Sequence, residues 1–185
     1  MNNHTCTKCT KGVITRLLFP ILLLFVGLET ASAQTTYNSS DIPKTIPATG
    51  SVNHTITSTL TITGSGMTIG DLNVGLNITH SYLSDIEITL SKGATSVILF
   101  NNSCGSSANI NMIADDEGST LVCPPLGGNS YQPNGGLSSF NNITLDGTWT
   151  LTIVDSWPSS DGGSLNSWSL IATEPCLAVA PTLSK

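Results

Sequence analysis

The sequence predicts an antiparallel all-β sandwich. Three observations indicate this fold: apolar and polar residues alternate through most of the chain, segments rich in Gly, Asn, Asp and Pro separate the alternating runs, and no long stretch keeps a helical period. Alternation places successive side chains on opposite faces of a strand, so each run has one face for a core and one for solvent. Many such short runs are typical of two stacked sheets.

Seven alternating or apolar runs are expected to be strands. They lie at residues 56–62, 72–79, 86–91, 97–100, 110–113, 148–153 and 165–172. Their many Ile and Thr residues fit a pleated surface. Trp149 and Trp168 lie in the last two runs and are expected in the core, whereas Trp157 is expected at a loop edge. Residues 124–139 are expected to form a long irregular connection.

The first 33 residues are expected to be an export signal. A basic region precedes an apolar stretch at 17–28 and a small-residue cleavage site, Ala31-Ser32-Ala33. The apolar stretch of 12 residues is too short to span a bilayer comfortably, which disfavours a retained membrane anchor. We therefore expect a secreted protein whose mature chain begins near Gln34.

The rest of the chain has the size of one acidic domain. We divide it into a leader at 34–50 that is a candidate for an edge strand, the β domain at 51–173, and a tail or linker at 174–185. Without residues 1–33, three lysines oppose 11 acidic residues (12 minus Glu29), which gives a net charge of −8. A charge of this sign makes nucleic acid and anionic membrane surfaces poor partners.

Three cysteines follow the predicted signal, so at most one internal disulfide can form. A Cys104–Cys123 bridge is favoured because it closes a loop around the acidic stretch, which adds about 3 kcal/mol under the chain-entropy model. Cys176 competes for either partner, and the sequence leaves that choice open. Cys6 and Cys9 form a CxxC inside the signal without a second pair at zinc spacing.

Five segments together resemble the P domain (P/Homo B domain) that follows the catalytic domain of subtilisin/kexin-like proprotein convertases and of many secreted bacterial serine proteases. The resemblance runs from Met67 to Ala172, and its most specific part is GTWTL, then Asp, then G-x-L-x-x-W-x-L. The segments are ITHSYLSDIEITL (78–90), ADDEG (114–118), LSSF (137–140), DGTWTLTIVDSW (146–157) and DGGSLNSWSL (161–170).

The resemblance implies a jelly-roll β-sandwich of the galactose-binding-like kind. It also implies an accessory role, because this domain packs on the protease in the convertases and supports its stability without taking part in catalysis. Two turns depart from the family pattern: SKGAT at 91–95 replaces a Ser-Pro-x-Gly-Thr type of turn, and Gly118 stands where Ala is more usual.

The sequence shows no catalytic constellation of its own. A serine protease needs a His between a nucleophilic Ser and an orienting carboxylate. His54 and His80 are the histidines after the predicted signal, and neither lies in a subtilisin motif; no G-x-S-x-G elbow is present either. We expect backbone groups at a strand end to hold the His80 ring. A glycosidase is disfavoured because the carboxylates stand in tandem, without an aromatic sugar platform beside them.

Acidic residues near strand ends predict a structural calcium site. Carboxylates about 4 Å apart repel by roughly 4 kcal/mol at an intermediate dielectric, and calcium offsets this repulsion with six to eight oxygen ligands. The expected ligands are Asp85, Asp115, Asp116 and Asp155, of which the resemblance supports the first three most directly. In the alternative interpretation, Glu117 and Asp161 face water and Asp116 caps a turn.

The sequence thus favours a secreted, non-catalytic P-domain protein that accompanies a subtilisin/kexin-like serine endopeptidase. Its expected partner is a protease catalytic domain or another extracellular protein. The alternative is a free-standing extracellular interaction or adhesion module without a protease. A third hypothesis, a hydrolase in its own right, requires peptide cleavage that is lost on His80→Ala.

Overall fold

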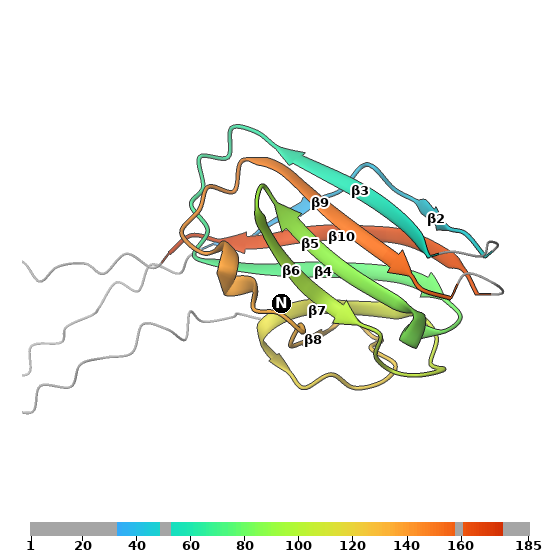
Figure 1. Cartoon of the computed structure of the whole chain (residues 1–185). Helices are drawn as coiled ribbons and strands as arrows, with labels where there is room; N and C mark the ends of the chain where they lie inside the picture. The colour runs from blue at the N-terminus through green and yellow to red at the C-terminus, as the bar shows by residue number, and fades with distance from the viewer. Residues whose placement is uncertain (1–32, 49–52, 158–160, 176–185) are drawn as a thin grey trace, which may run out of the picture.

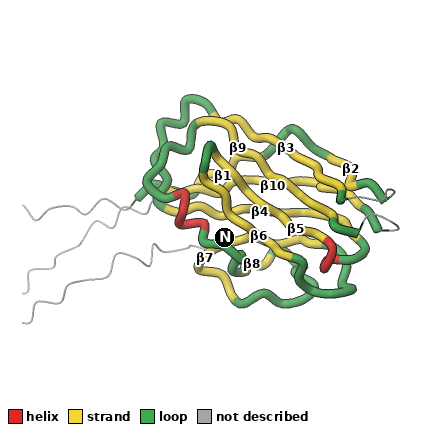
Figure 2. The backbone as a smooth tube through the Cα atoms, viewed as in Figure 1, coloured by secondary structure: helices red, strands yellow, loops and turns green. Residues whose placement is uncertain are grey.

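The computed structural model describes residues 33–48, 53–157 and 161–175, so of the predicted export signal only Ala33 lies among the described residues. Within these ranges the chain forms two β-sheets packed face to face and two short 3-10 helices (Figure 1). The strands make up both layers, while loops gather at the two ends (Figure 2). The all-β sandwich expected from the sequence is confirmed.

The larger sheet has the order β1-β10-β4-β7-β8, and β2 also pairs with β10. Its strands are β1 (Thr35–Asn38), β2 (Lys44–Ile46), β4 (Asp71–His80), β7 (Ile110–Ser119), β8 (Asn129–Tyr131) and β10 (Gly163–Thr173). The smaller sheet has the order β3-β9-β5-β6. Its strands are β3 (His54–Ile62), β5 (Ile86–Lys92), β6 (Thr95–Asn101) and β9 (Gly147–Asp155). The helices are η1 (Leu83–Asp85) and η2 (Leu137–Phe140).

The core lies between the two sheets, as the alternation predicts. In β9 the side chains of Trp149, Leu151 and Ile153 are buried, and the threonines between them are half-buried. Trp168 of β10 is also buried, whereas Trp157 is 62% exposed. All three tryptophans therefore lie where the sequence places them. No helix in the described part of the chain is long and apolar enough to cross a bilayer.

The leader supplies β1 and β2, which both pair with β10, in agreement with its expected role as a source of an edge strand. The connection at 124–139, by contrast, is more regular than expected. The connection at 124–139 contains β8, which pairs with β7 in parallel, whereas the other strand pairs among the described residues are antiparallel. Three residues are too few to show an alternation, so β8 was not predicted.

β7 also runs further than expected, through Ser119, so the acidic stretch belongs to a strand. Its backbone there lies against β8: a Cβ at Gly118 would stand 2.7 Å from the Tyr131 nitrogen. The alanine that is more usual at this position would therefore force the two strands apart. The departure from the family pattern at Gly118 fits this close approach.

The predicted Cys104–Cys123 disulfide is present, with a Cα–Cα distance of 5.2 Å. Cys176 lies outside the described residues.

We expect the double variant Cys104→Ser, Cys123→Ser to fold with a free energy of unfolding lower by about 3 kcal/mol. The reason is that the bridge closes a loop in the unfolded chain and so lowers its conformational entropy. Urea unfolding of both proteins measures the difference. Reductant should destabilise the parent chain by the same amount and leave the double variant unchanged. Equal stability of the two proteins without reductant would contradict the prediction.

Candidate functional site

The structure places the four predicted calcium ligands in two separate regions. Asp155 pairs in register with Ile86, which follows Asp85 directly. Because Asp155 Oδ2 lies 3.4 Å from His80 Nε2, these two acids lie at the His80 end of β4. Ala114 instead pairs with Val74, six positions before His80 along β4. Asp115 and Asp116 are consequently roughly 20 Å from the His80 end, at about 3.3 Å per residue.

Asp116 binds backbone groups of a distant segment. Its carboxylate accepts the Leu137 N–H at 2.8 Å and the Ser138 N–H at 2.9 Å, and so holds the start of η2 against the end of β7. This agrees with the alternative expectation of a capping role, although the capped turn lies 21 residues away. The neighbouring Asp115 accepts the Glu117 N–H at 2.9 Å, and burial raises the pKa of the Asp115 carboxyl.

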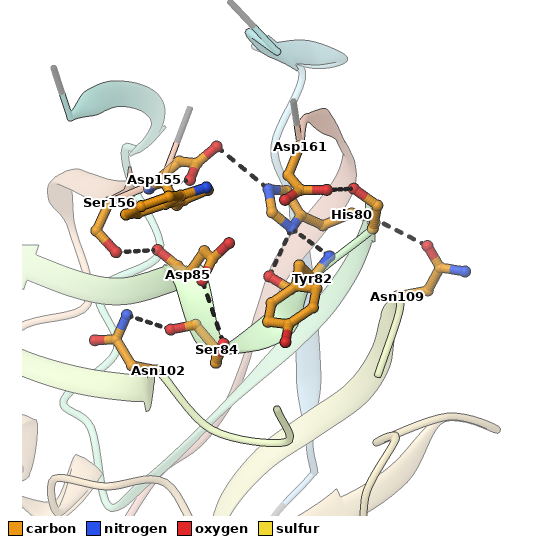
Figure 3. Close-up of polar contacts among 11 residues, drawn as sticks. His80, Tyr82, Ser84, Asp85, Asn102, Asn109, Asp155, Ser156 and Asp161 are labelled. Atoms are coloured by element: carbon orange, nitrogen blue, oxygen red, sulfur yellow. Dashed lines mark hydrogen bonds and ion pairs between the residues drawn. The ribbon is translucent and has the colours of Figure 1, made fainter. Parts of the chain in front are cut away.

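The most buried polar pair of the site is His80 and Asp155, which are 1% and 0% exposed. His80 Nε2 lies 3.4 Å from Asp155 Oδ2, and the Tyr82 N–H donates to His80 Nδ1 at 3.2 Å (Figure 3). Asp155 Oδ1 accepts the Trp157 N–H at 3.0 Å. The expected backbone partner of His80 is therefore present, but Asp155, 75 residues away, was not foreseen as its second partner.

This pair holds a turn and is not arranged to activate a serine. Both ring nitrogens of His80 have partners, and neither partner is a hydroxyl. The nearby serines point elsewhere: Ser81 Oγ donates to Asp161, Ser84 Oγ to the Asp85 carboxylate, and Ser156 Oγ to the Asp85 carbonyl. The bonds of the His80 ring therefore form no hydroxyl–imidazole–carboxylate relay of the kind that serine proteases use.

A hollow of about 220 Å³ opens at the same end of the sandwich. Its walls are Tyr82, Asp85, Trp157 and Asp161. Burial raises the pKa of the Asp85 carboxyl, and the negative charges of Asp161 and Asp155 raise it further. The ionised form of Asp85 in the hollow is therefore destabilised by burial and by the neighbouring carboxylates.

We expect Asp85→Asn to raise the melting temperature slightly at pH 7. The folded protein raises the pKa of Asp85 above its unfolded value, so ionisation of this group costs stability at any pH above its folded pKa, and the cost disappears below pH 3.8. Calorimetry at pH 7 and near pH 3 measures the two differences. A lower melting temperature at pH 7, or an equal gain at both pH values, would contradict the prediction.

A comparison with known protein families identifies the family of this chain. The sequence pattern of the proprotein convertase P-domain matches residues 69–172, more than half of the chain. The chain belongs to this family. Among solved structures, the P-domain chain is similar to one described as the crystal structure of the serine protease of Aeromonas sobria, with 19% identity and a TM-score of 0.41. That alignment covers 77% of this chain and 27% of the protease. No curated protein matches the sequence.

Three segments of the P-domain pattern meet at the His80 end. His80 comes from the segment at 78–90, Asp155 from the segment at 146–157, and Asp161 from the segment at 161–170. A fourth, at 114–118, supplies Asp116, whose carboxylate reaches the fifth at 137–140. The residues that carry the resemblance therefore bind one another across long sequence separations.

Calcium binding stays a prediction. Calcium needs six to eight oxygen ligands, but both carboxylate oxygens of Asp116 and of Asp155 already bind protein groups. No set of three or more His, Cys, Asp or Glu side chains in the described ranges is placed to share an ion. The four acids named from the sequence do not fit one common site.

The test of calcium is the change that a chelator causes in the parent chain. At a free calcium concentration a hundred times the dissociation constant, binding adds about 2.7 kcal/mol to the free energy of unfolding. EDTA should therefore lower the melting temperature, and added calcium should restore it. Asp116→Asn is a poor probe when used alone, because it also weakens the bonds to Leu137 and Ser138. An unchanged melt with and without EDTA would dispose of the prediction.

Proposed function

We propose that this P-domain is a secreted, non-catalytic accessory module that packs on the catalytic domain of a subtilisin/kexin-like serine endopeptidase and stabilises it. The family match over residues 69–172 carries the proposal. The His80 environment supports a non-catalytic role, because Tyr82 and Asp155 occupy both ring nitrogens. The Cys104–Cys123 bridge supports export, since disulfides persist mainly in oxidising compartments.

The proposed partner can be tested with a covalent probe for serine hydrolases. A tagged chain is recovered from the culture medium of its source, and the eluate is treated with a fluorophosphonate, which labels an activated serine. We expect label on a co-purifying protein and none on the P-domain chain itself. Removing the chain should lower the melting temperature of the labelled protein.

Other outcomes would favour the other hypotheses. If the tagged chain is recovered from the medium and no labelled protein co-purifies with it, the result would favour a free-standing interaction or adhesion module. Peptide cleavage by the purified chain, lost on His80→Ala while circular dichroism still shows a folded sandwich, would favour a hydrolase. An eluate from an untagged culture is the matched control for the labelling.

A further inference from the structure

The hollow at the His80 end has two aromatic walls in addition to its two acidic ones. Trp157 is 62% exposed and Tyr82 is 41% exposed, and they are two of the four large apolar side chains that the described residues leave exposed. Asp85 and Asp161 complete the lining. Figure 3 shows Tyr82, Asp85 and Asp161 grouped around the buried His80. Tyrosine and tryptophan are enriched in protein–protein interfaces relative to the rest of the protein surface.

The negative charges around the hollow favour a positively charged ligand. Asp85 feels the negative charges of both Asp161 and Asp155, and Ser81 holds Asp161 in place through a 2.7 Å hydrogen bond. The two lysines among the described residues are engaged elsewhere. Lys44 forms an ion pair with Asp41 at 2.6 Å. Lys92 binds the carbonyls of Thr144 and Asp146 and lies 4.8 Å from the centre of a Trp149 ring.

The size and the walls of the hollow select the kind of cation. A volume of about 220 Å³ is below the roughly 300–1,000 Å³ of typical small-molecule pockets, so it suits a single side chain. Calcium gains nothing from aromatic faces, and beside only two carboxylates it would have to take most of its six to eight oxygen ligands from other groups or water. A guanidinium group, by contrast, stacks on aromatic rings and forms paired hydrogen bonds with carboxylates.

We propose that the hollow lined by Tyr82, Asp85, Trp157 and Asp161 binds an arginine side chain presented by a partner protein. A second copy of the exported chain does not supply this group, because the single arginine of the sequence, Arg16, lies in the predicted export signal. The binding site goes beyond the accessory role proposed above, and it does not depend on the partner being a protease.

Tryptophan fluorescence reports on the hollow directly. Trp149 and Trp168 are buried, so ligand contact should change the emission of the exposed Trp157. The purified chain is titrated with N-acetyl-argininamide, its lysine counterpart, and the neutral isostere N-acetyl-citrullinamide. We expect a saturable change with the arginine probe and a dissociation constant on the order of 1–10 mM, as for a single side chain with a few contacts. Lysine should bind more weakly, and citrulline should not bind.

The double variant Asp85→Asn, Asp161→Asn should bind the arginine probe at least tenfold more weakly. Glu87→Gln removes an acidic charge from outside the lining of the hollow and should bind as the parent does. Thermal melts show that each variant is folded. In nuclear magnetic resonance spectra of the parent, the amide chemical shifts of Tyr82 and Asp85 should change as the arginine probe is added. In Trp157→Ala the same shifts should stay constant.

The proposal would be overturned if the arginine probe caused no saturable change, or if the citrulline or lysine probe bound as tightly as the arginine probe. It would also be overturned if the folded double variant bound the arginine probe as the parent does. The same saturable change with calcium chloride alone would overturn it too. A chain that binds the arginine probe but recovers no labelled protease would leave the hollow assigned and the accessory role contradicted.

Discussion

Replacing Asp155 with alanine should lower the free energy of unfolding by about 2–5 kcal/mol, because two polar groups lose their common partner at about 1–3 kcal/mol each. His80 and Asp155 are almost completely excluded from solvent, so His80 Nε2 would lose its partner in a place that water does not reach. The Trp157 N–H would lose its acceptor at the same time. Urea unfolding followed by circular dichroism measures the difference.

Asp155→Asn is the matched control for this substitution. Asparagine keeps an oxygen for the Trp157 N–H and offers an N–H to His80 Nε2. If the proton of the imidazole moves to Nδ1, it can donate to the Tyr82 carbonyl, 3.0 Å away. The Tyr82 N–H, which donates to Nδ1 in the parent, then loses its acceptor. We therefore expect a loss of about 1–2 kcal/mol, from this bond and from the charge-assisted part of the bond to Asp155. A loss below about 1 kcal/mol in Asp155→Ala would contradict the role given to the pair.

Trp168→Ala should also cost about 3–5 kcal/mol, as large-to-small substitutions of buried aromatic residues do. The Trp168 ring fills the core between the sheets, and its Nε1–H donates to Ser58 Oγ at 2.8 Å. Ser58 is fully buried on β3 and donates in turn to the Asp41 carbonyl at 2.8 Å. One side chain of β10 therefore links the larger sheet to the smaller one and to the leader.

Trp168→Phe separates packing from the hydrogen bond. It keeps most of the ring and loses the donor to Ser58, so we expect a loss of about 1–2 kcal/mol. Ser58→Ala in the Trp168→Phe background should then add little beyond the lost bonds to Asp41 and to the Ser39 hydroxyl. A loss in Trp168→Phe as large as that in Trp168→Ala would show that the hydrogen bond, and not the packed volume, dominates.

The strand positions followed from the sequence because alternation is a local property. Each strand that buries one face must repeat with period 2, and Trp149, Leu151 and Ile153 show that repeat whatever strand lies beside them. β8 escaped prediction because it is only three residues long and owes its form to pairing with β7.

The site was only partly predictable, since its contacts join residues far apart in the chain. The sequence singled out Asp85, Asp116, Asp155 and His80, but it could not tell which acid meets which partner. Sheet register decides that Asp155 reaches His80 and that Asp116 reaches Leu137 instead of joining Asp85. A shift of one residue in any of these strands would have turned the acid to the other face.

The amino-acid sequence by itself determined the fold class, the core tryptophans and the family of this protein, because these depend on local patterns and short motifs. Only the tertiary structure decided that the acids fall into two regions and that Tyr82 and Trp157 frame a hollow with Asp85 and Asp161. The physical reason is that strand pairing places each side chain relative to distant segments. The electrostatic effect of a carboxylate depends on the groups that this pairing brings next to it.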